Sequence, residues 1–309
     1  MQDLSPRTLT QLRAEGWSTR RVAQAVRDGQ LIRPTYGMYA AATKVTDADA
    51  HLNRARAILM RQSASAVLSH TSAAVAHGLP LPQRNPATVH FTVAPPVRGR
   101  RRPGYQAHGA ALDADEVVSM HGILVTSLER TVIDVMRSSP YLWAVIAADW
   151  ALNQGVSREA MLSYADEHPG CHGVPVLRQA ALFADIGGKS PAESASRVSI
   201  ARAGLPAPVL QFEVMSPYGW EATSDFAWLD QGVVGEVDGK SKYGRLLQPG
   251  QTAEEAIMAE KARDERIRQA GWWPVHWDWA TAFTPSALAI LVRGAFEDPA
   301  ARRIRHRSC

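Results

Sequence analysis

Residues 223–239 read TSDFAWLDQGVVGEVDG and carry the strongest structural signal in the chain. Two runs typical of β-strands, Thr223–Trp228 and Val233–Val237, flank a short turn at Asp230. Side chains alternate between the two faces of a strand, so this hairpin separates into an apolar face and an acidic face. The apolar face, which we expect to belong to the core, holds Phe226, Trp228, Val233 and Val237.

The acidic face gathers three carboxylates. A turn centred at Asp230 places Asp225 directly opposite Glu236, and Asp238 lies on the same face as Glu236. Like charges directly opposite on paired strands repel, so three carboxylates on one face favour a bound cation. Mg²⁺ prefers oxygen ligands, and metal ions assist phosphodiester hydrolysis. A solvated acidic face without a metal is the alternative interpretation.

The size and composition describe a globular chain of two or three domains. It has 309 residues, 46% of them hydrophobic, and a net charge of +4. No run of about 18 apolar residues is present, and the first residues lack the layout of a signal peptide, so we expect no membrane span. The two cysteines, Cys171 and Cys309, form neither a zinc motif nor a disulfide framework, which fits a reducing cytoplasm.

Arginines are clustered along the chain. The clusters are Arg20-Arg21, Arg98 with Arg100–Arg102, and the tail residues Arg302, Arg303, Arg305 and Arg307. Clustered basic groups beside an acidic site suit a protein that handles a polyanion. Solvated loops and a frayed tail are the alternative for each cluster. We expect Arg100, Arg101 and Arg102 to lie in a loop and to contact DNA.

Residues 1–45 have the element order of a winged helix-turn-helix. A first helix ends near Gly16, Ser18 is a plausible cap for a basic helix at Thr19–Arg27, and two short strands follow over Leu31–Ala40. In such modules a helix enters the major groove of DNA. The outward side chains of the basic helix, expected to contact DNA, are Arg20, Arg21, Gln24 and Arg27. A helical oligomerisation or packing domain is the alternative.

Residues 46–186 form an α+β middle domain in which we find no catalytic constellation. Helices are expected at Asp47–Gln62 and Ser65–His77, and a strand at Val89–Val93, with two further strands before a run of four helices. Five histidines occur here at irregular spacings, so a structural or exposed role is expected for each. They are His70, His77, His90, His108 and His121.

Residues 187–309 show an α/β pattern. A helix beginning at Ser190 precedes three strands of antiparallel character. A helix at Thr252–Ala270, a strand at Trp273–Trp277 and a final helix complete the pattern. Glu193 follows Ser190 by three residues with a proline between them, which is also the spacing of a capping box. Glu193 is therefore either a catalytic carboxylate or part of a helix cap.

Residues 190–280 resemble the very-short-patch-repair branch of the PD-(D/E)XK nuclease superfamily. The matching elements are Pro191-Ala-Glu193-Ser194, Asp225-Phe-Ala-Trp228, Gly235-Glu236-Val-Asp238-Gly, Glu260-Lys261-Ala-Arg263-Asp264 and Gly271-Trp272-Trp273-Pro. The first 45 residues, and more loosely the chain to about residue 185, resemble the antitoxin half of actinobacterial AbiE-type toxin–antitoxin systems. The resemblance implies a restriction-endonuclease-like α/β domain at the C-terminal end, preceded by a winged helix.

The nuclease resemblance implies a site for Mg²⁺ or Mn²⁺. Asp225 and Glu236 match the acidic pair of the superfamily and are the expected metal ligands, together with Asp238. Glu193 matches the carboxylate that the superfamily carries on a helix. All four residues are thus candidates for the catalytic centre.

The chain departs from the superfamily pattern at one position. A lysine normally stands two residues after the second acid, and here Asp238 stands there instead. We expect Lys242, or else Lys261 on the next helix, to supply the displaced lysine, which positions water or stabilises charge in the transition state. Arg263 and Asp264 are expected to form pairs on the helix surface.

Two functions from different classes fit these features. The first is a Mg-dependent DNA endonuclease, targeted by its N-terminal DNA-binding module. The second is a transcriptional repressor or antitoxin whose nuclease-like domain is catalytically inert and binds DNA or a toxin partner, because fold alone does not fix function. The intact acids favour the enzyme. A homodimer is left open, since winged-helix proteins often dimerise.

Overall fold

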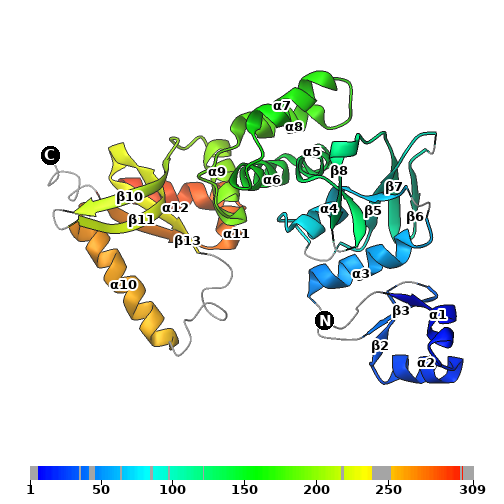
Figure 1. Cartoon of the computed structure of the whole chain (residues 1–309). Coiled ribbons are helices and arrows are strands. Elements are labelled where there is room, and N and C mark those ends of the chain that lie inside the picture. The colour runs from blue at the N-terminus through cyan, green and yellow to red at the C-terminus, as the bar shows by residue number, and fades with distance from the viewer. Residues whose placement is uncertain are drawn as a thin grey trace. The chain divides into compact units, whose positions relative to one another are not determined.

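The structure is a computed structural model that describes residues 6–34, 36–41, 46–62, 65–83, 86–96, 98–120, 122–216, 219–238, 252–299 and 301. The chain separates into two compact units, Met1–Leu182 and Phe183–Cys309. The described residues form three sheets with helices beside them (Figure 1). The expected mixed α/β and α+β class with several domains is confirmed at this level.

The beginning of the first unit packs two helices against a small sheet. Its elements are β1 (Arg7–Thr8), α1 (Leu9–Ala14), α2 (Thr19–Arg27), β2 (Leu31–Ile32) and β3 (Met38–Ala41), with strand order β1-β3-β2. The hydroxyl of Ser18 accepts a hydrogen bond of 3.1 Å from the backbone N–H of Arg21, so the predicted cap of α2 is confirmed. Leu12, Val22 and Tyr39 are buried in the shared core.

The rest of the first unit surrounds a six-stranded sheet of order β6-β7-β5-β4-β9-β8. The strands are β4 (Val67–Leu68), β5 (Val89–Val93), β6 (Arg100–Arg102), β7 (Tyr105–Gly109), β8 (Val117–Met120) and β9 (Ile123–Thr126). The helices are α3 (Asp47–Leu59), α4 (His70–His77), the 3-10 turn η1 (Ala114–Glu116), α5 (Leu128–Ser138), α6 (Tyr141–Asn153), α7 (Arg158–Glu167) and α8 (Val174–Phe183).

Two sequence predictions in this unit were wrong. The single helix expected at Ser65–His77 is a strand followed by a helix, because Leu68 pairs with Phe91 on one side and with Val125 on the other. The run Arg100–Arg102 was expected in a loop, but it forms β6, which pairs antiparallel with β7 at the edge of the sheet. The partners of β4 lie far away in sequence and override its local propensity, whereas β6 pairs with the strand that directly follows it, through a short turn between Arg102 and Tyr105.

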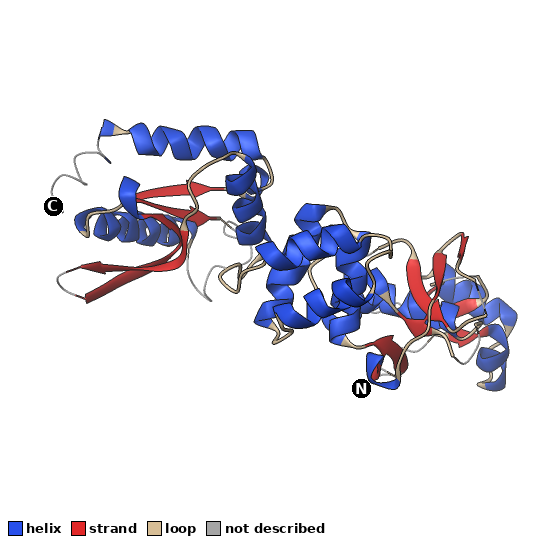
Figure 2. Cartoon of the chain, turned by 90° about the horizontal axis from the view of Figure 1, so that it is seen from above, coloured by secondary structure: helices blue, strands red, loops and turns tan. Residues whose placement is uncertain are grey.

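The second unit has one four-stranded sheet of order β10-β11-β12-β13. Its elements are α9 (Pro191–Arg202), β10 (Val209–Ser216), β11 (Gly219–Trp228), the 3-10 turn η2 (Leu229–Gln231), β12 (Val233–Val237), α10 (Ala253–Gln269), β13 (Trp273–Trp277), α11 (Trp279–Ala282) and α12 (Pro285–Glu297). The first three strands are antiparallel, whereas β13 runs parallel to β12. Figure 2 shows helices on both sides of these strands.

The two faces of this sheet differ in character. On the side of α9 and α12, Trp277 donates a hydrogen bond of 2.8 Å to Ser196, and Trp228 stacks edge-on against Phe296. On the opposite side, Ile267 of α10 packs against an apolar cluster of the sheet. That cluster contains Val214, Ala222, Ala227 and Val234. Glu236, discussed below, faces α10, because it pairs with Arg263 of that helix.

No helix among the described residues is long and apolar enough to cross a membrane.

Candidate functional site

The acidic positions of β11 and β12 lie where the hairpin strands end. Phe226 pairs with Gly235 in the antiparallel register, and continuing that register by one residue brings Asp225 opposite Glu236. The carboxylate of Asp225 accepts a hydrogen bond of 2.9 Å from the backbone N–H of Val237. Asp225 thus reaches across to β12 through its side chain, close to Glu236.

Asp225 lies in surroundings that oppose its negative charge. The pKa of its carboxyl is raised to about 7. Burial is the largest cause, and the nearby carboxylates of Glu193 and Glu236 also contribute to the rise. The hydrogen bond from Val237 and the charge of Arg263 act in the opposite direction. A carboxyl whose pKa lies near neutrality is typical of a site in which carboxylates are crowded together.

Glu193, at the start of α9, is turned toward the sheet. The hydroxyl of Ser190 caps α9 by accepting from the N–H of Glu193 at 3.2 Å. The carboxylate of Glu193 accepts from the N–H of Lys189 at 3.1 Å and from the side-chain amide of Gln211, on β10, at 3.0 Å. Ser190 therefore acts as the cap, while the Glu193 carboxylate contributes to the electrostatics around Asp225.

Glu236 is paired with an arginine of α10. Its carboxylate lies 2.5 Å from Arg263 Nη1 and accepts a hydrogen bond of 3.3 Å from Ser224. Arg263 also donates to the backbone carbonyl of Thr223 at 3.0 Å. The expectation that Arg263 pairs along the helix surface was therefore wrong. α10 packs across the sheet and directs Arg263 onto Glu236 of β12 and Thr223 of β11. The guanidinium neutralises one carboxylate of the crowded set.

A second acidic group adjoins the first. Asp238, Glu260 of α10 and His276 of β13 each offer one ligand atom, and these atoms lie within 4.8 Å of one another. His276 stands beside Glu236 in the parallel register of β12 and β13. The set therefore combines two carboxylates and one imidazole, drawn from three different elements.

The imidazole of His276 is oriented by Asp264. His276 Nε2 lies 3.0 Å from the Asp264 carboxylate, so Nε2–H is the donor and Nδ1 carries the lone pair. Nδ1 is buried and has no hydrogen-bond partner among the residues that the structure describes. An imidazole that donates one N–H to a carboxylate and leaves its other nitrogen free is the usual arrangement of a metal-bound histidine. His276 joins the group with Asp238 and Glu260 through one of its ring nitrogens.

One of the three predicted metal ligands, Asp238, belongs to this group. Over the described part of the chain, Asp238 forms a metal-sized group with Glu260 and His276, and Asp225 and Glu236 do not join it. Of the two predicted lysines, the structure describes only Lys261. Lys242 lies outside the described residues, and Lys261 is an exposed residue of α10, next to Glu260.

Glu260 and His276 were missed by the sequence argument. The signal for His276 was its place in β13 between Val275 and Trp277, both buried, because alternation puts His276 on the other face of the strand from these two. Glu260 precedes Asp264 by one helical turn, so both project from the same face of α10. Only the packing of α10 against the sheet brings that face to Asp238.

The predicted DNA-contacting residues are exposed on two elements of the first unit. Those of α2 are Arg20, Arg21, Gln24 and Arg27. Arg21 lies over the ring of Trp17 at 4.2 Å, and Gln24 donates to Asp28 at 2.7 Å. Those of β6 are Arg100, Arg101 and Arg102, all exposed on an edge strand. Both sets are thus available for contact from the surface.

Comparisons with known proteins add little on activity. No protein-family model matches the chain. An uncharacterized protein of Mycobacterium tuberculosis, Rv2248 in strain H37Rv and MT2308 in strain CDC 1551, is 28% identical over 251 residues, which cover 80% of this chain and 85% of that protein. The crystal structure of the RV2827C protein from the same organism matches 69% of this chain and 84% of its own, with 16% identity and a TM-score of 0.38.

Proposed function

We propose that the protein is a metal-dependent DNA endonuclease whose C-terminal unit belongs to the PD-(D/E)XK type and holds Mg²⁺ or Mn²⁺. Two observations carry the proposal: the ligand atoms of Asp238, Glu260 and His276 lie within 4.8 Å of one another, and His276 Nδ1 is buried without a hydrogen-bond partner among the described residues. Two carboxylates with one imidazole form a mixed oxygen and nitrogen set, and carboxylates suit Mg²⁺ and Mn²⁺. The residues present therefore fit the group.

Each neighbouring side chain has a role in this proposal. A bound divalent cation would polarise the scissile phosphate and lower the pKa of a coordinated water. Asp264 fixes the tautomer of His276, and Asp225, with a carboxyl pKa of about 7, can take up or release a proton at neutral pH. Arg263 contacts both the carboxylate of Glu236 and the backbone carbonyl of Thr223 and can also meet a phosphate oxygen.

We assign target binding to a winged helix-turn-helix formed by residues 6–41, which fits the sequence of elements β1-α1-α2-β2-β3. The exposed arginines of α2 and β6 would contact the phosphate backbone, a contact that weakens with rising salt. The bound substrate would be duplex DNA held by basic side chains that lie outside the acidic unit.

Nicking of supercoiled plasmid by the full-length chain tests this function. We expect cutting in Mg²⁺ or Mn²⁺ that is lost with EDTA and falls at least a hundredfold in Glu260→Gln and His276→Gln. Glu265→Gln is the matched control, since Glu265 lies on the same helix but points to solvent. Cutting that is absent in the wild type, or equal in all the variants, contradicts the proposal.

A repressor or antitoxin with an inert nuclease-like unit is the second candidate. The observation that favours it is the ion pair of Arg263 with Glu236, which already neutralises an acid that the superfamily uses for metal. Such a protein would bind operator DNA through α2 and a toxin partner elsewhere. A footprint on the DNA upstream of its own gene, weakened in an Arg20→Ala/Arg21→Ala variant, combined with no metal-dependent cutting, would identify this function.

A further inference from the structure

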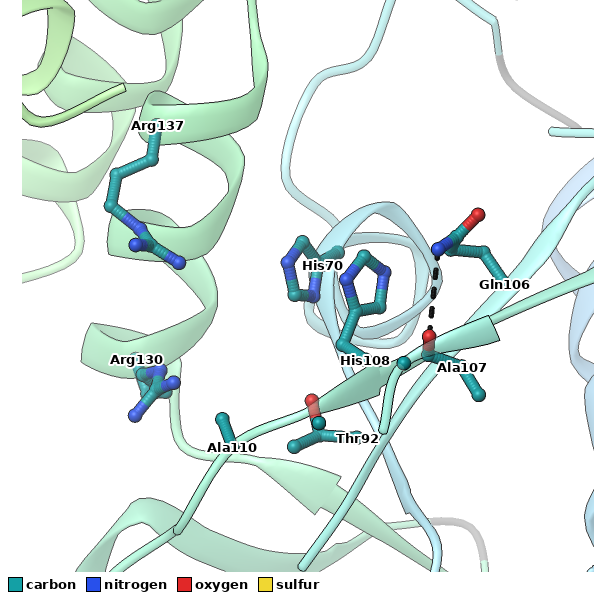
Figure 3. A pocket seen from close by; sticks show the side chains of 10 residues that line it. His70, Thr92, Gln106, Ala107, His108, Ala110, Arg130 and Arg137 are labelled. Atoms are coloured by element: carbon teal, nitrogen blue, oxygen red, sulfur yellow. Dashed lines mark hydrogen bonds between the residues drawn. The ribbon is translucent and has the colours of Figure 1, made fainter. Parts of the chain in front are cut away.

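The first unit contains a cavity unrelated to the acidic site. Its volume is about 350 Å³, and His70, Thr92, His108, Arg130 and Arg137 line it (Figure 3). These residues come from α4, β5, β7 and α5, so the sheet and two helices enclose the space. Two of the five middle histidines for which the sequence predicted a structural or exposed role thus line this cavity.

The imidazoles of His70, His90 and His108 are packed together. The rings of His70 and His108 stack with centroids 3.7 Å apart, and His90 Nδ1 lies 3.0 Å from His108 Nε2. β5 and β7 create this cluster, because their parallel register sets His90 opposite Gln106 and Thr92 opposite His108. The histidines are thus neighbours through the sheet, despite their irregular sequence spacing.

The backbone at His70 is itself unusual. His70 has φ of 51°, a left-handed conformation that is rare for residues other than glycine. Such strained conformations concentrate at functional sites. Here the conformation starts α4 and turns the imidazole toward His108 and the cavity, as Figure 3 shows.

Positive charge dominates the wall opposite the rings. Arg130 and Arg137 are seven residues apart on α5, about two helical turns. Both donate to the buried carboxylate of Asp134, at 3.2 Å each. Arg130 also donates to Glu116 at 2.8 Å. The Nε of Arg137 is buried and has no hydrogen-bond partner among the described residues. One guanidinium donor therefore remains unsatisfied beside the cavity.

Burial and the nearby positive charges lower the pKa values of these histidines. The pKa of His70 is lowered to about 2. Burial is the largest cause, and the neighbouring histidines and the two arginines also contribute. Burial, followed by Arg137, lowers the pKa of His108 to about 4. His70 Nδ1 lies 3.7 Å from Asp134, but with so low a pKa the ring is neutral, and this contact is not an ion pair.

We propose that this cavity binds a phosphate group, either inorganic phosphate or the terminal phosphate of a small monoester. The guanidinium groups of Arg130 and Arg137 and the rings of His70 and His108 line the cavity from several directions, which suits a tetrahedral oxyanion better than a flat carboxylate. The hydroxyl of Thr92 donates to Ser69 at 2.9 Å and is not counted among these groups. The volume lies at the lower end of the range for small-molecule sites, so a phosphate with one attached group of modest size fits.

Calorimetric titration of the full-length chain with sodium phosphate and with AMP, in chloride buffer at constant ionic strength, tests the proposal. We expect binding that weakens at least tenfold in His108→Gln and in Arg137→Lys, which keeps the charge but removes Nε. His70→Asn, a residue that tolerates positive φ, should weaken it similarly. His172→Asn is the matched control, because His172 is an exposed histidine of the same unit and lies outside the cavity.

The arms of this experiment separate the sources of phosphate. Tighter binding of AMP than of phosphate assigns the cavity to a monoester, and tighter binding of phosphate assigns it to the free ion; both support the proposal. No heat from either ligand, or equal affinities in the wild type and all three cavity variants, overturns it. Line broadening of the phosphorus NMR signal repeats the measurement for any variant too unstable for calorimetry.

Discussion

The raised pKa of Asp225 makes the stability of the C-terminal unit depend on pH. The carboxyl binds a proton more tightly in the folded protein, at a pKa of about 7, than in the unfolded chain, where the ordinary value is 3.8. Between these values the folded state holds the extra proton, so the free energy of unfolding falls as pH rises from about 4 to about 7 and is constant above. Asp225→Asn removes this dependence.

The size of the effect follows from the shift. About three pKa units at ~1.4 kcal/mol each give an upper limit of ~4 kcal/mol. The unfolding free energy of Asp225→Asn should therefore exceed that of the wild type at pH 8 by up to about 4 kcal/mol. Near pH 4 the two proteins should differ little, because Asp225 is then protonated in the folded state.

Urea unfolding at a series of pH values, followed by tryptophan fluorescence, measures this difference. Most tryptophans of the chain lie in the C-terminal unit, so the signal reports on it. Glu213→Gln is the matched control, since Glu213 is an exposed carboxylate on β10 of the same sheet. A pH dependence that is the same in the wild type and in Asp225→Asn would refute the assignment of a crowded carboxyl at this position.

Three further substitutions probe the packing around the site. Gly235→Ala places a Cβ 2.6 Å from the ring of Trp277, and the overpacking should destabilise the protein by ~1–3 kcal/mol in thermal melts; an unchanged melting temperature would show that the ring moves away freely. Ser18→Ala removes the cap of α2 and should lower the free energy of unfolding by ~1 kcal/mol. A loss below a few tenths of a kcal/mol would show that the Ser18 hydroxyl is not the cap. Arg263→Met leaves the carboxylate of Glu236 without its cation and should cost ~1–3 kcal/mol, whereas adding Glu236→Gln should restore part of it; additive losses in the double variant would contradict a direct pair.

The hairpin of the C-terminal unit could be predicted because its information is local. The alternation in residues 223–239 sets two strands, and β12 spans Val233–Val237 as the sequence indicates. The same holds for Ser18 and α2, where a cap and an apolar stripe lie within ten residues. In these segments periodicity, capping and turn chemistry agree with one another.

The meeting of elements far apart in sequence could not be predicted. Glu260 and His276 reach Asp238 because α10 crosses one face of the sheet and β13 pairs parallel with β12. Nothing in the local pattern fixes which turn of α10 faces the acids. The strand β4 is likewise only two residues long and exists through its pairing with β5 and β9, so the small residues around it read as a helix.

Binding of Mn²⁺ followed by electron paramagnetic resonance tests the central claim most directly, because the signal of free Mn²⁺ falls as the ion is bound. We expect the wild-type chain to take up about one equivalent at pH 7.5. His276→Gln and Glu260→Gln should each weaken uptake at least tenfold, whereas Glu265→Gln should not. Free Mn²⁺ signals that are identical with and without the wild-type chain, or uptake unaffected by both substitutions, would contradict a metal site at Asp238, Glu260 and His276.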